Sequence, residues 1–241
     1  MKLAVITDVH ANLPALRAAL AAIENEGCDE IIHTGDAIDI GPFPGECLEI
    51  LLSLKNISFV MGNHDAQFVE GIQPWMNERL GPDHIEHRHW THSRIRPALR
   101  KAVAAWPIRL ERTLGRTKLS FIHYGLDESG NDFAPVIPQP TPEAMDRLFK
   151  VEKADIIFHG HSHFFSDLSG VSRYVNPGAL GCHDRPAARF AFVEERSGTV
   201  SVSFREALYE DHELFEAFER EKVPAREFIY RTFMGGRFVP A

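Results

Sequence analysis

The stretch Phe158-His159-Gly160-His161-Ser162-His163 follows the apolar run from Ala154 to Ile157, and it places two histidines two residues apart where a strand should end. In an extended segment, residues i and i+2 face the same side, so His161 and His163 should point at one place. Imidazole is the commonest side-chain ligand of metal ions. This stretch therefore predicts a metal site at the end of a strand.

Four further apolar runs end in the same way, at residues that can bind a metal. The run from Leu3 to Thr7 leads into Asp8-Val9-His10, which has the same i, i+2 spacing, and the other three runs lead to Asp36, to Asn63-His64-Asp65 and to His123. In open α/β sheets, ligands bind in the crevice outside the carboxyl ends of the strands. One His-x-His pair is weak evidence, but five such endings in one chain strongly indicate a shared site.

The size and composition of the chain indicate a soluble protein with a full hydrophobic core. Its 241 residues suffice for one large domain, and the chain enters a strand directly, without a leader or a run long enough to span a membrane. Three scattered cysteines suggest neither a disulfide framework nor a thiolate zinc site, so we expect a cytoplasmic location. The formal charge of −8 argues against a nucleic-acid partner but not against a nucleotide substrate.

Apolar periodicity predicts a βαβ opening that is later interrupted by a helical insertion. Asn12 is a plausible N-cap for a helix that runs to Gly27. From about residue 66 to 107, strands give way to a helical segment, interpreted as a cap above the site, in which the tryptophans form the cap core: Trp75, Trp90 and Trp106.

The second half of the chain is predicted to be mainly strands, followed by helices. A hairpin turned at Gly115 is expected within 110–122, and the turn signals Ser169-Gly170 and Ser197-Gly198 indicate a meander after His163. Charged amphipathic helices are expected over about 208–234, with a break at Pro224.

Taken in order, the strand-end motifs resemble those of the calcineurin-like metallophosphoesterase superfamily. They are Asp8-Val9-His10, Gly35-Asp36, Gly62-Asn63-His64-Asp65, His123 and Gly160-His161-Ser162-His163. Asp8-Val9-His10-Ala11-Asn12-Leu13, Asn176-Pro177-Gly178-Ala179 and Arg185-Pro186-Ala187 more narrowly resemble its small bacterial and archaeal phosphodiesterase-like branch. The resemblance spans about residues 1–195. It implies a single α/β domain over 1–241, a four-layer α-β-β-α sandwich of two mixed sheets with the helical cap.

The resemblance also implies two divalent metal ions. Asp8, His10 and His163 would bind one ion, Asn63, His123 and His161 would bind the other, and Asp36 would bridge them. Manganese is expected first, with iron, zinc, cobalt or nickel as alternatives, because all of them accept such ligands. Two metals about 3.5 to 4 Å apart can hold the attacking and leaving oxygens of a displacement and lower the pKa of a bridging water. His64 would assist the leaving group, and Asp65 would orient His64.

The predicted function is therefore dinuclear, metal-dependent hydrolysis of a small phosphate ester or nucleotide. Protein Ser/Thr phosphatases of the superfamily carry an Arg after the second motif, where this chain has Ile40; a residue that cannot clamp a dianionic phosphate favours diesters. A phosphomonoesterase, a dinucleoside polyphosphate hydrolase and a non-catalytic metal-binding scaffold are the alternatives. The complete ligand set and His64 argue against the scaffold, and the acidic balance argues against a repair-type nuclease. The oligomeric state stays open.

The remaining histidines are interpreted as structural. His33 and His159 are expected to be satisfied strand-end residues. The group His84, His87, His89 and His92 has spacings that do not form one helical face, so a solvated segment is preferred to a third metal site or a substrate-facing surface. For His183 and Arg185, a phosphate contact and an exposed turn are equally compatible with the sequence.

Overall fold

The computed structural model describes residues 1–73, 80–128, 130 and 132–237, which form two five-stranded sheets with helices on the outside. The first sheet has the order β10-β9-β1-β2-β3 and the second has the order β4-β5-β6-β8-β7. The strands of the first sheet are β1 (Lys2–Ile6), β2 (Glu30–His33), β3 (Ile57–Phe59), β9 (Ala187–Arg196) and β10 (Thr199–Leu208). Those of the second are β4 (Arg109–Leu114), β5 (Thr117–Ile122), β6 (Ile156–Phe158), β7 (Ser166–Ser169) and β8 (Arg173–Asn176).

Both sheets are mixed, as predicted. The strands β1, β2 and β3 are parallel, as are β5, β6 and β8, whereas β9 and β10 in the first sheet and β4 and β7 in the second pair antiparallel with their neighbours. The helices are α1 (Leu13–Glu26), α2 (Pro44–Ser53), α3 (Asn63–Glu70), α5 (Pro82–Ser93), η1 (Pro97–Leu99), α6 (Arg100–Val103), α7 (Pro142–Leu148), α8 (His212–Arg220) and α9 (Arg226–Phe233). None of the helices described is long and apolar enough to cross a bilayer.

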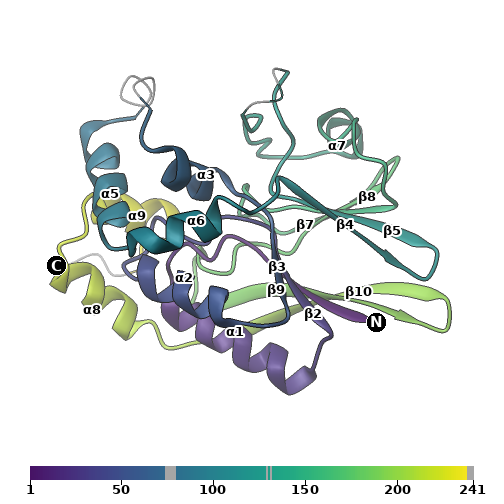
Figure 1. Cartoon of the computed structure of the whole chain (residues 1–241), viewed down its shortest axis with the longest axis horizontal. Coiled ribbons are helices and arrows are strands. Elements are labelled where there is room, and N and C mark those ends of the chain that lie inside the picture. Colours follow the sequence, from purple (N-terminus) through teal and green to yellow (C-terminus); the bar gives the residue numbers. More distant parts are fainter. Residues whose placement is uncertain (74–79, 129, 131, 238–241) are drawn as a thin grey trace.

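Side chains of β1 alternate between two hydrophobic cores, as expected for a strand that is buried on both faces. Leu3 and Val5 belong to the core between the two sheets, whereas Ala4 and Ile6 belong to the core beneath the helices. A third core includes Met145 of α7 and covers the outer face of the second sheet. The layers are therefore α1 with α2, the first sheet, the second sheet and α7, which is the predicted four-layer sandwich (Figure 1).

Helix α1 follows the rules from which it was predicted. The Asn12 side chain accepts a hydrogen bond from the Ala15 amide at 3.1 Å, and Pro14 occupies the first turn, where its missing N–H costs nothing. Leu16 and Ile23 are buried on the face turned to the sheet. The helix ends at Gly27, whose φ of 71° suits glycine.

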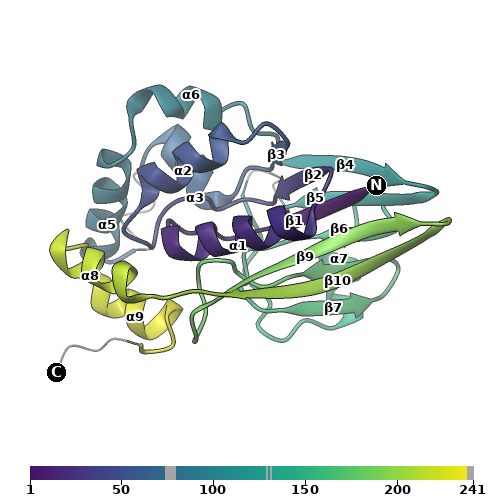
Figure 2. The same ribbon diagram turned by 90° about the horizontal axis from the view of Figure 1, so that it is seen from below.

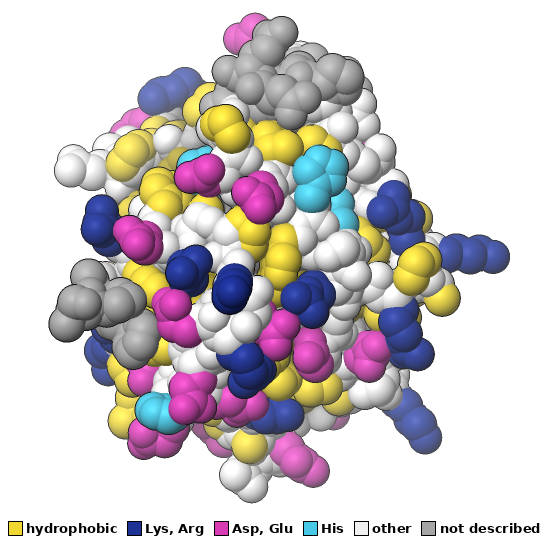
Figure 3. Space-filling model, turned by 90° about the vertical axis from the view of Figure 1, so that its left-hand side faces the viewer, with side chains coloured by type: hydrophobic (Ala, Val, Ile, Leu, Met, Phe, Trp, Pro, Cys, Tyr) yellow, Lys and Arg dark blue, Asp and Glu magenta, His cyan; other side chains and the backbone are white. Residues whose placement is uncertain are grey.

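The loops that carry the five motifs lie at one end of the sandwich, because the carboxyl ends of parallel strands meet at the same edge of a sheet. Helices α5, α8 and α9 also gather at this end, beyond the strands (Figure 2). Seen from that side, acidic and basic side chains are interspersed among apolar ones (Figure 3). This face therefore differs from the basic surface that tight non-specific nucleic-acid binding needs.

The strands after His163 do not form one meander: β7 and β8 pair in the second sheet, whereas β9 and β10 pair in the first. The loop around Asn176-Pro177-Gly178 carries the chain from one sheet to the other, a crossing that local turn signals do not reveal.

The described part of 66–107 is helical, as expected, and Trp106 stacks on Phe59 with ring centroids 4.4 Å apart. Trp75 lies outside the described residues.

Candidate active site

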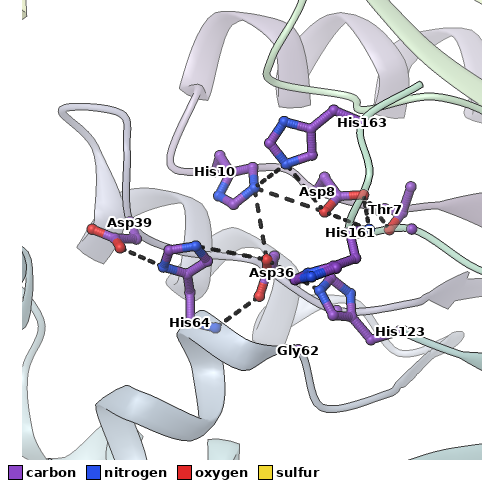
Figure 4. Close-up of polar contacts among 12 residues, drawn as sticks. Thr7, Asp8, His10, Asp36, Asp39, Gly62, His64, His123, His161 and His163 are labelled. Carbon is purple, nitrogen blue, oxygen red and sulfur yellow. Dashed lines mark hydrogen bonds and ion pairs between the residues drawn. The ribbon is translucent and has the colours of Figure 1, made fainter. Parts of the chain in front are cut away.

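The seven residues predicted as metal ligands come together at the ends of five strands, and Figure 4 labels six of them, all except Asn63. Asp8 and His10 follow β1, Asp36 follows β2, Asn63 begins α3 after β3, His123 follows β5, and His161 and His163 follow β6. Side chains of His, Asp and Cys form three clusters here whose potential ligand atoms lie within 4.8 Å of one another. Asp36 belongs to two of these clusters, which places its carboxylate between the two halves of the site.

The first half of the site is built around a pair of imidazoles. The Nε2 atoms of His10 and His163 lie 2.9 Å apart, and Oδ1 of Asp8 lies 3.7 and 3.6 Å from them. The carbonyl of Ile38, 3.1 Å from Nδ1 of His10, can only accept, so Nδ1 carries the proton and Nε2 presents a lone pair. Burial and the neighbouring His163 hold the pKa of His10 well below its usual value.

The second half has the same construction. Nδ1 of His123 donates to the Thr34 carbonyl at 2.9 Å, which leaves Nε2 facing Asn63 Oδ1 at 3.0 Å and Asp36 Oδ2 at 3.2 Å. Nδ1 of His161 lies 2.8 Å from the same Asn63 oxygen. Lone pairs of the His123, Asn63 and Asp36 side chains thus point at one place, and a cation is needed there to offset their mutual repulsion.

Either a proton or a metal ion can supply that cation. Burial would lower the pKa of His123, but the Asp36 carboxylate raises it to about 9. Burial would raise the pKa of Asp36, but His123 and His64 hold it well below its usual value. The backbone carbonyls that fix the His10 and His123 rings are the kind of outer partners that orient metal-ligating histidines. The first half offers Asp and His donors, the second offers Asn and His donors, and Asp36 is shared, so the residues present fit two divalent transition metals.

The backbone at this site is held in an uncommon conformation. Five of the seven predicted ligands have positive φ: Asp8 at 51°, His10 at 47°, Asp36 at 59°, His161 at 65° and His163 at 61°. Non-glycine residues rarely adopt this region, and such strain concentrates at functional sites. Packing of neighbouring chain segments sustains it: a Cβ added to Gly160 would collide with the Thr7 hydroxyl and the Asp8 carboxylate.

His64 lies at the edge of the cluster of predicted ligands, and Asp39 contacts its ring. Nδ1 of His64 contacts Oδ2 of Asp39, while Nε2 lies 4.0 Å from Oδ2 of Asp36. Burial would lower the pKa of His64, but Asp36 and Asp39 together raise it. The Asp39 carboxylate also approaches His87 at 2.9 Å and Thr91 at 3.2 Å, so α5 helps to hold it.

Asp65, which we expected to orient His64, is placed elsewhere by the structure. Its carboxylate accepts hydrogen bonds from the backbone amides of Asp36 at 2.7 Å, Ala37 at 3.0 Å and Gly62 at 3.1 Å. Burial and the Asp36 carboxylate raise its pKa to about 7. Asp65 thus clamps the loop that carries Asp36, and Asp39 takes the place beside His64. In the sequence, the Asp-x-x-Asp spacing of Asp36 and Asp39 was the signal that could have identified Asp39 as the partner of His64.

Cys182 also reaches the site, which the sequence did not suggest. Its sulfur lies in one cluster with His10 and His163, and the residue is buried. Cysteine spacing carries no information about this position, because the contact arises only when the loop after β8 returns across the ends of both sheets.

Three of the remaining histidines differ from expectation. His87 is not solvated: it is 5% exposed, and its Nδ1 donates to the Pro224 carbonyl at 3.0 Å. His33 and His159 are buried, and each Nδ1 has a polar backbone neighbour. Each Nε2 has no hydrogen-bond partner within the described part of the chain, so these two are not fully satisfied as we had expected. Both rings pack against aromatic side chains instead.

Three cavities surround the metal-ligand cluster. One of about 660 Å³ is bordered by His161, His163, His183 and Arg185. A second of about 360 Å³ is bordered by Asn63 and His161, and a third of about 270 Å³ lies beside His64. Arg185 pairs with Glu206, and so does Arg189, so these cations are partly neutralised. The spaces match small molecules in size.

Comparison with known proteins gives one family and several similar structures. The model of the calcineurin-like phosphoesterase superfamily domain matches residues 1–198. An uncharacterized protein of Methanocaldococcus jannaschii is 32% identical over 170 residues, which cover 67% of this chain and 62% of that protein. The chain thus spans less than two thirds of that relative.

Two solved structures share the fold over nearly their whole length. A hypothetical protein from Pyrococcus horikoshii OT3 has a TM-score of 0.77 at 22% identity, with 98% of this chain and 99% of that chain covered. A metallophosphoesterase from Sphaerobacter thermophilus has a TM-score of 0.72 at 23% identity, with 96% and 97% covered.

Proposed function

Because this chain belongs to the calcineurin-like phosphoesterase superfamily, we propose that it hydrolyses a small phosphodiester or nucleotide with two divalent metal ions at the described site. At the level of the family, the chain is a metal-dependent phosphoesterase, a hydrolase of phosphate esters. The diester preference, the two ions and the identity of the metal, manganese in the first place, are the proposal.

One observation carries the proposal: two sets of inward-facing donor atoms share Asp36. Its Oδ2 lies 3.2 Å from Nε2 of His123 and 3.7 Å from Nε2 of His10, which belong to opposite halves of the site. In this proposal Asp8, His10 and His163 hold one ion, Asn63, His123 and His161 hold the other, and Asp36 contacts both. When bound, two such ions activate water and neutralise charge on the phosphate.

His64 is proposed to serve the leaving group. Contact with Asp39 keeps the proton on Nδ1, so Nε2 is turned toward Asp36 and the ligand cluster. Asp36 and Asp39 raise the pKa of His64 against the effect of burial, which increases the protonated fraction of the ring, and a protonated ring can give its Nε2 proton to the departing oxygen. Asp39, rather than Asp65, is the positioning residue in this scheme.

The preference for diesters is supported by what surrounds His64. Ile40, where an arginine would clamp a dianion, is 4% exposed and borders the 270 Å³ cavity. That cavity is lined largely by apolar side chains, including Leu80, Phe228 and Phe233. An ester whose leaving group is apolar or aromatic fits such a space better than a second charged phosphate does.

The test compares bis-p-nitrophenyl phosphate with p-nitrophenyl phosphate, in manganese and in chelator. The wild type should cleave the diester faster, and chelation should abolish cleavage. His64→Ala should reduce kcat by about 100-fold or more, within the range for general acid catalysis. His212→Ala is the control, because His212 is an exposed histidine on α8. Metal binding without turnover of either ester would instead favour a non-catalytic scaffold, and faster monoester cleavage would favour a phosphomonoesterase.

We also propose that the chain is a single domain of the cytoplasm, with residues 66–107 as a cap. All three cysteines are free thiols, consistent with a reducing compartment. Cell fractionation and a single cooperative unfolding transition are the respective checks.

A further inference from the structure

Helix α5 carries an arginine to the space beside the metal-ligand cluster. Arg88 borders the 360 Å³ cavity together with Asn63 and His161, and it borders the 270 Å³ cavity together with His64. Asn63 and His161 are two of the three proposed ligands of one metal, and His64 is the proposed acid. Arg88 therefore lies between the two spaces that a phosphate ester would fill on either side of its phosphorus atom.

The Arg88 side chain is largely but not fully buried, and not all of its donor groups have a partner among the described residues. This side chain is 12% exposed, and Nε donates to Oε1 of Gln67 at 2.7 Å. One terminal nitrogen lies 3.9 Å from Asp39 Oδ2, beyond hydrogen-bond distance, and within the described ranges no hydrogen bond is recorded for either terminal nitrogen. Two parallel donors are thus left for a ligand.

Helix α3 positions this arginine relative to the metal site. Gln67 lies one turn beyond Asn63 and His64 on α3, and residues four apart share a helix face. The bond from Arg88 to Gln67 therefore ties α5 to the same helix turn that supplies a proposed metal ligand and the proposed acid. A guanidinium held through Nε presents its terminal nitrogens as a planar fork, the geometry that suits two phosphate oxygens.

We propose that Arg88 binds the non-bridging oxygens of the substrate phosphate. A phosphodiester keeps two non-bridging oxygens, so a bidentate contact from Arg88 agrees with the proposed diester preference, whereas the side chain of Ile40 can donate to neither oxygen. The residue comes from the helical insertion rather than from a strand-end motif, so binding of substrate would also fasten α5 over the site. This inference rests on the proposed phosphoesterase function and names the group that holds the scissile phosphate.

The test uses Arg88→Met, Arg88→Lys and a matched control. Arg94→Met removes an arginine at the end of the same helix that pairs with Glu221 and is 46% exposed. Binding of inorganic phosphate to the manganese-loaded protein is measured by calorimetry, and kcat and KM are measured for bis-p-nitrophenyl phosphate. Arg88→Met should weaken phosphate binding and raise KM by about 10- to 100-fold, the range for hydrogen bonds to charged groups, with a smaller effect on kcat. Arg88→Lys should retain part of the affinity, and Arg94→Met should match the wild type.

The two readouts separate this inference from the proposed function. Unchanged phosphate affinity and KM in Arg88→Met would overturn the inference and leave the phosphoesterase intact. If the wild type cleaves neither ester, phosphate binding still decides whether Arg88 is the anion ligand. If Arg88→Met fails to fold, Arg88→Lys is the variant that tests the inference. Wild-type affinity for inorganic phosphate in Arg88→Lys would exclude bidentate recognition by Arg88.

Discussion

The Nδ1 atom of His64 contacts Oδ2 of Asp39, and the same Asp39 carboxylate lies 2.9 Å from His87 of α5. One buried carboxylate thus joins a loop of the first sheet, the first turn of α3 and the helical insertion. The arrangement selects the tautomer of His64 and fixes the direction of its ring, the role that a third group plays for a general acid or base.

Replacing Asp39 by Asn should lower kcat by about 10- to 100-fold, because the ring loses its orientation and part of its proton affinity. Removing a carboxylate that raises the pKa of His64 must lower this pKa. Because the protonated ring is the proposed acid, the alkaline limb of the pH–rate profile should move to lower pH. Asp83→Asn, at an exposed position of α5, is the control. If the alkaline limb of the pH–rate profile stays at the wild-type pH in Asp39→Asn, His64 is not the general acid.

Replacing Asp65 by Ala should act on stability more than on the pH–rate profile. The change leaves three backbone amides without their acceptor, so the free energy of unfolding should fall by about 3 kcal/mol. Urea denaturation of the metal-free protein measures this loss. A stable variant with a shifted alkaline limb would instead restore Asp65 as the partner of His64.

Metal content distinguishes a shared from a terminal ligand. The wild type should retain two ions per chain after dialysis against manganese, His163→Ala should retain about one, and Asp36→Asn should weaken both sites by about 10-fold or more. Elemental analysis and calorimetry give these values. Loss of a single ion in Asp36→Asn, with the other bound normally, would show that Asp36 does not bridge.

Replacing Gly160 by Ala should damage metal binding. The added methyl group would displace the Thr7 hydroxyl or the Asp8 carboxylate, so affinity at the first half of the site should drop. Gly81→Ala serves as the control, because its added Cβ meets no atom of the described residues within 4 Å. Equal metal affinities for the two variants would mean that the close packing of Gly160 is not needed to place Asp8.

The ion pair between Glu30 and Arg112 predicts a pH dependence of stability far from the metal site. Arg112 donates to both carboxylate oxygens, at 3.0 and 2.6 Å, and its hydrogen bonds lower the pKa of Glu30. Because the pKa of Glu30 is lower in the folded than in the unfolded protein, the ion pair stabilises the fold at pH values above the unfolded-state pKa. This stabilisation is lost as the pH falls through the folded-state pKa.

Glu30→Gln should therefore cost about 1 kcal/mol at pH near 7 and close to nothing in acid. Urea denaturation of the metal-free proteins at both pH values checks this. A cost that is the same at both would assign the effect to packing rather than to charge.

Local signals in the sequence predicted the strands that end at the site, the first helix and the strand-end residues, whereas the two mixed sheets and the roles of the seven proposed ligands came from the family resemblance. Apolar runs of strand length and caps such as Asn12 act within a few residues, and strand ends such as Asp8-Val9-His10 mark the edge of a sheet wherever it packs. Parallel pairing then brings those ends together by a general rule of α/β folds.

Tertiary structure alone decided the contacts between residues far apart in the chain. Asp39 rather than Asp65 meets His64, because the loop after β2 folds over the start of α3. Cys182 and Arg88 reach the site from a crossing loop and from a helical insertion, neither of which carries a periodic signal. The physical reason is that such contacts depend on how whole helices and strands pack. The free energy that favours this packing comes from many contacts throughout the hydrophobic cores and not from any single segment of the sequence.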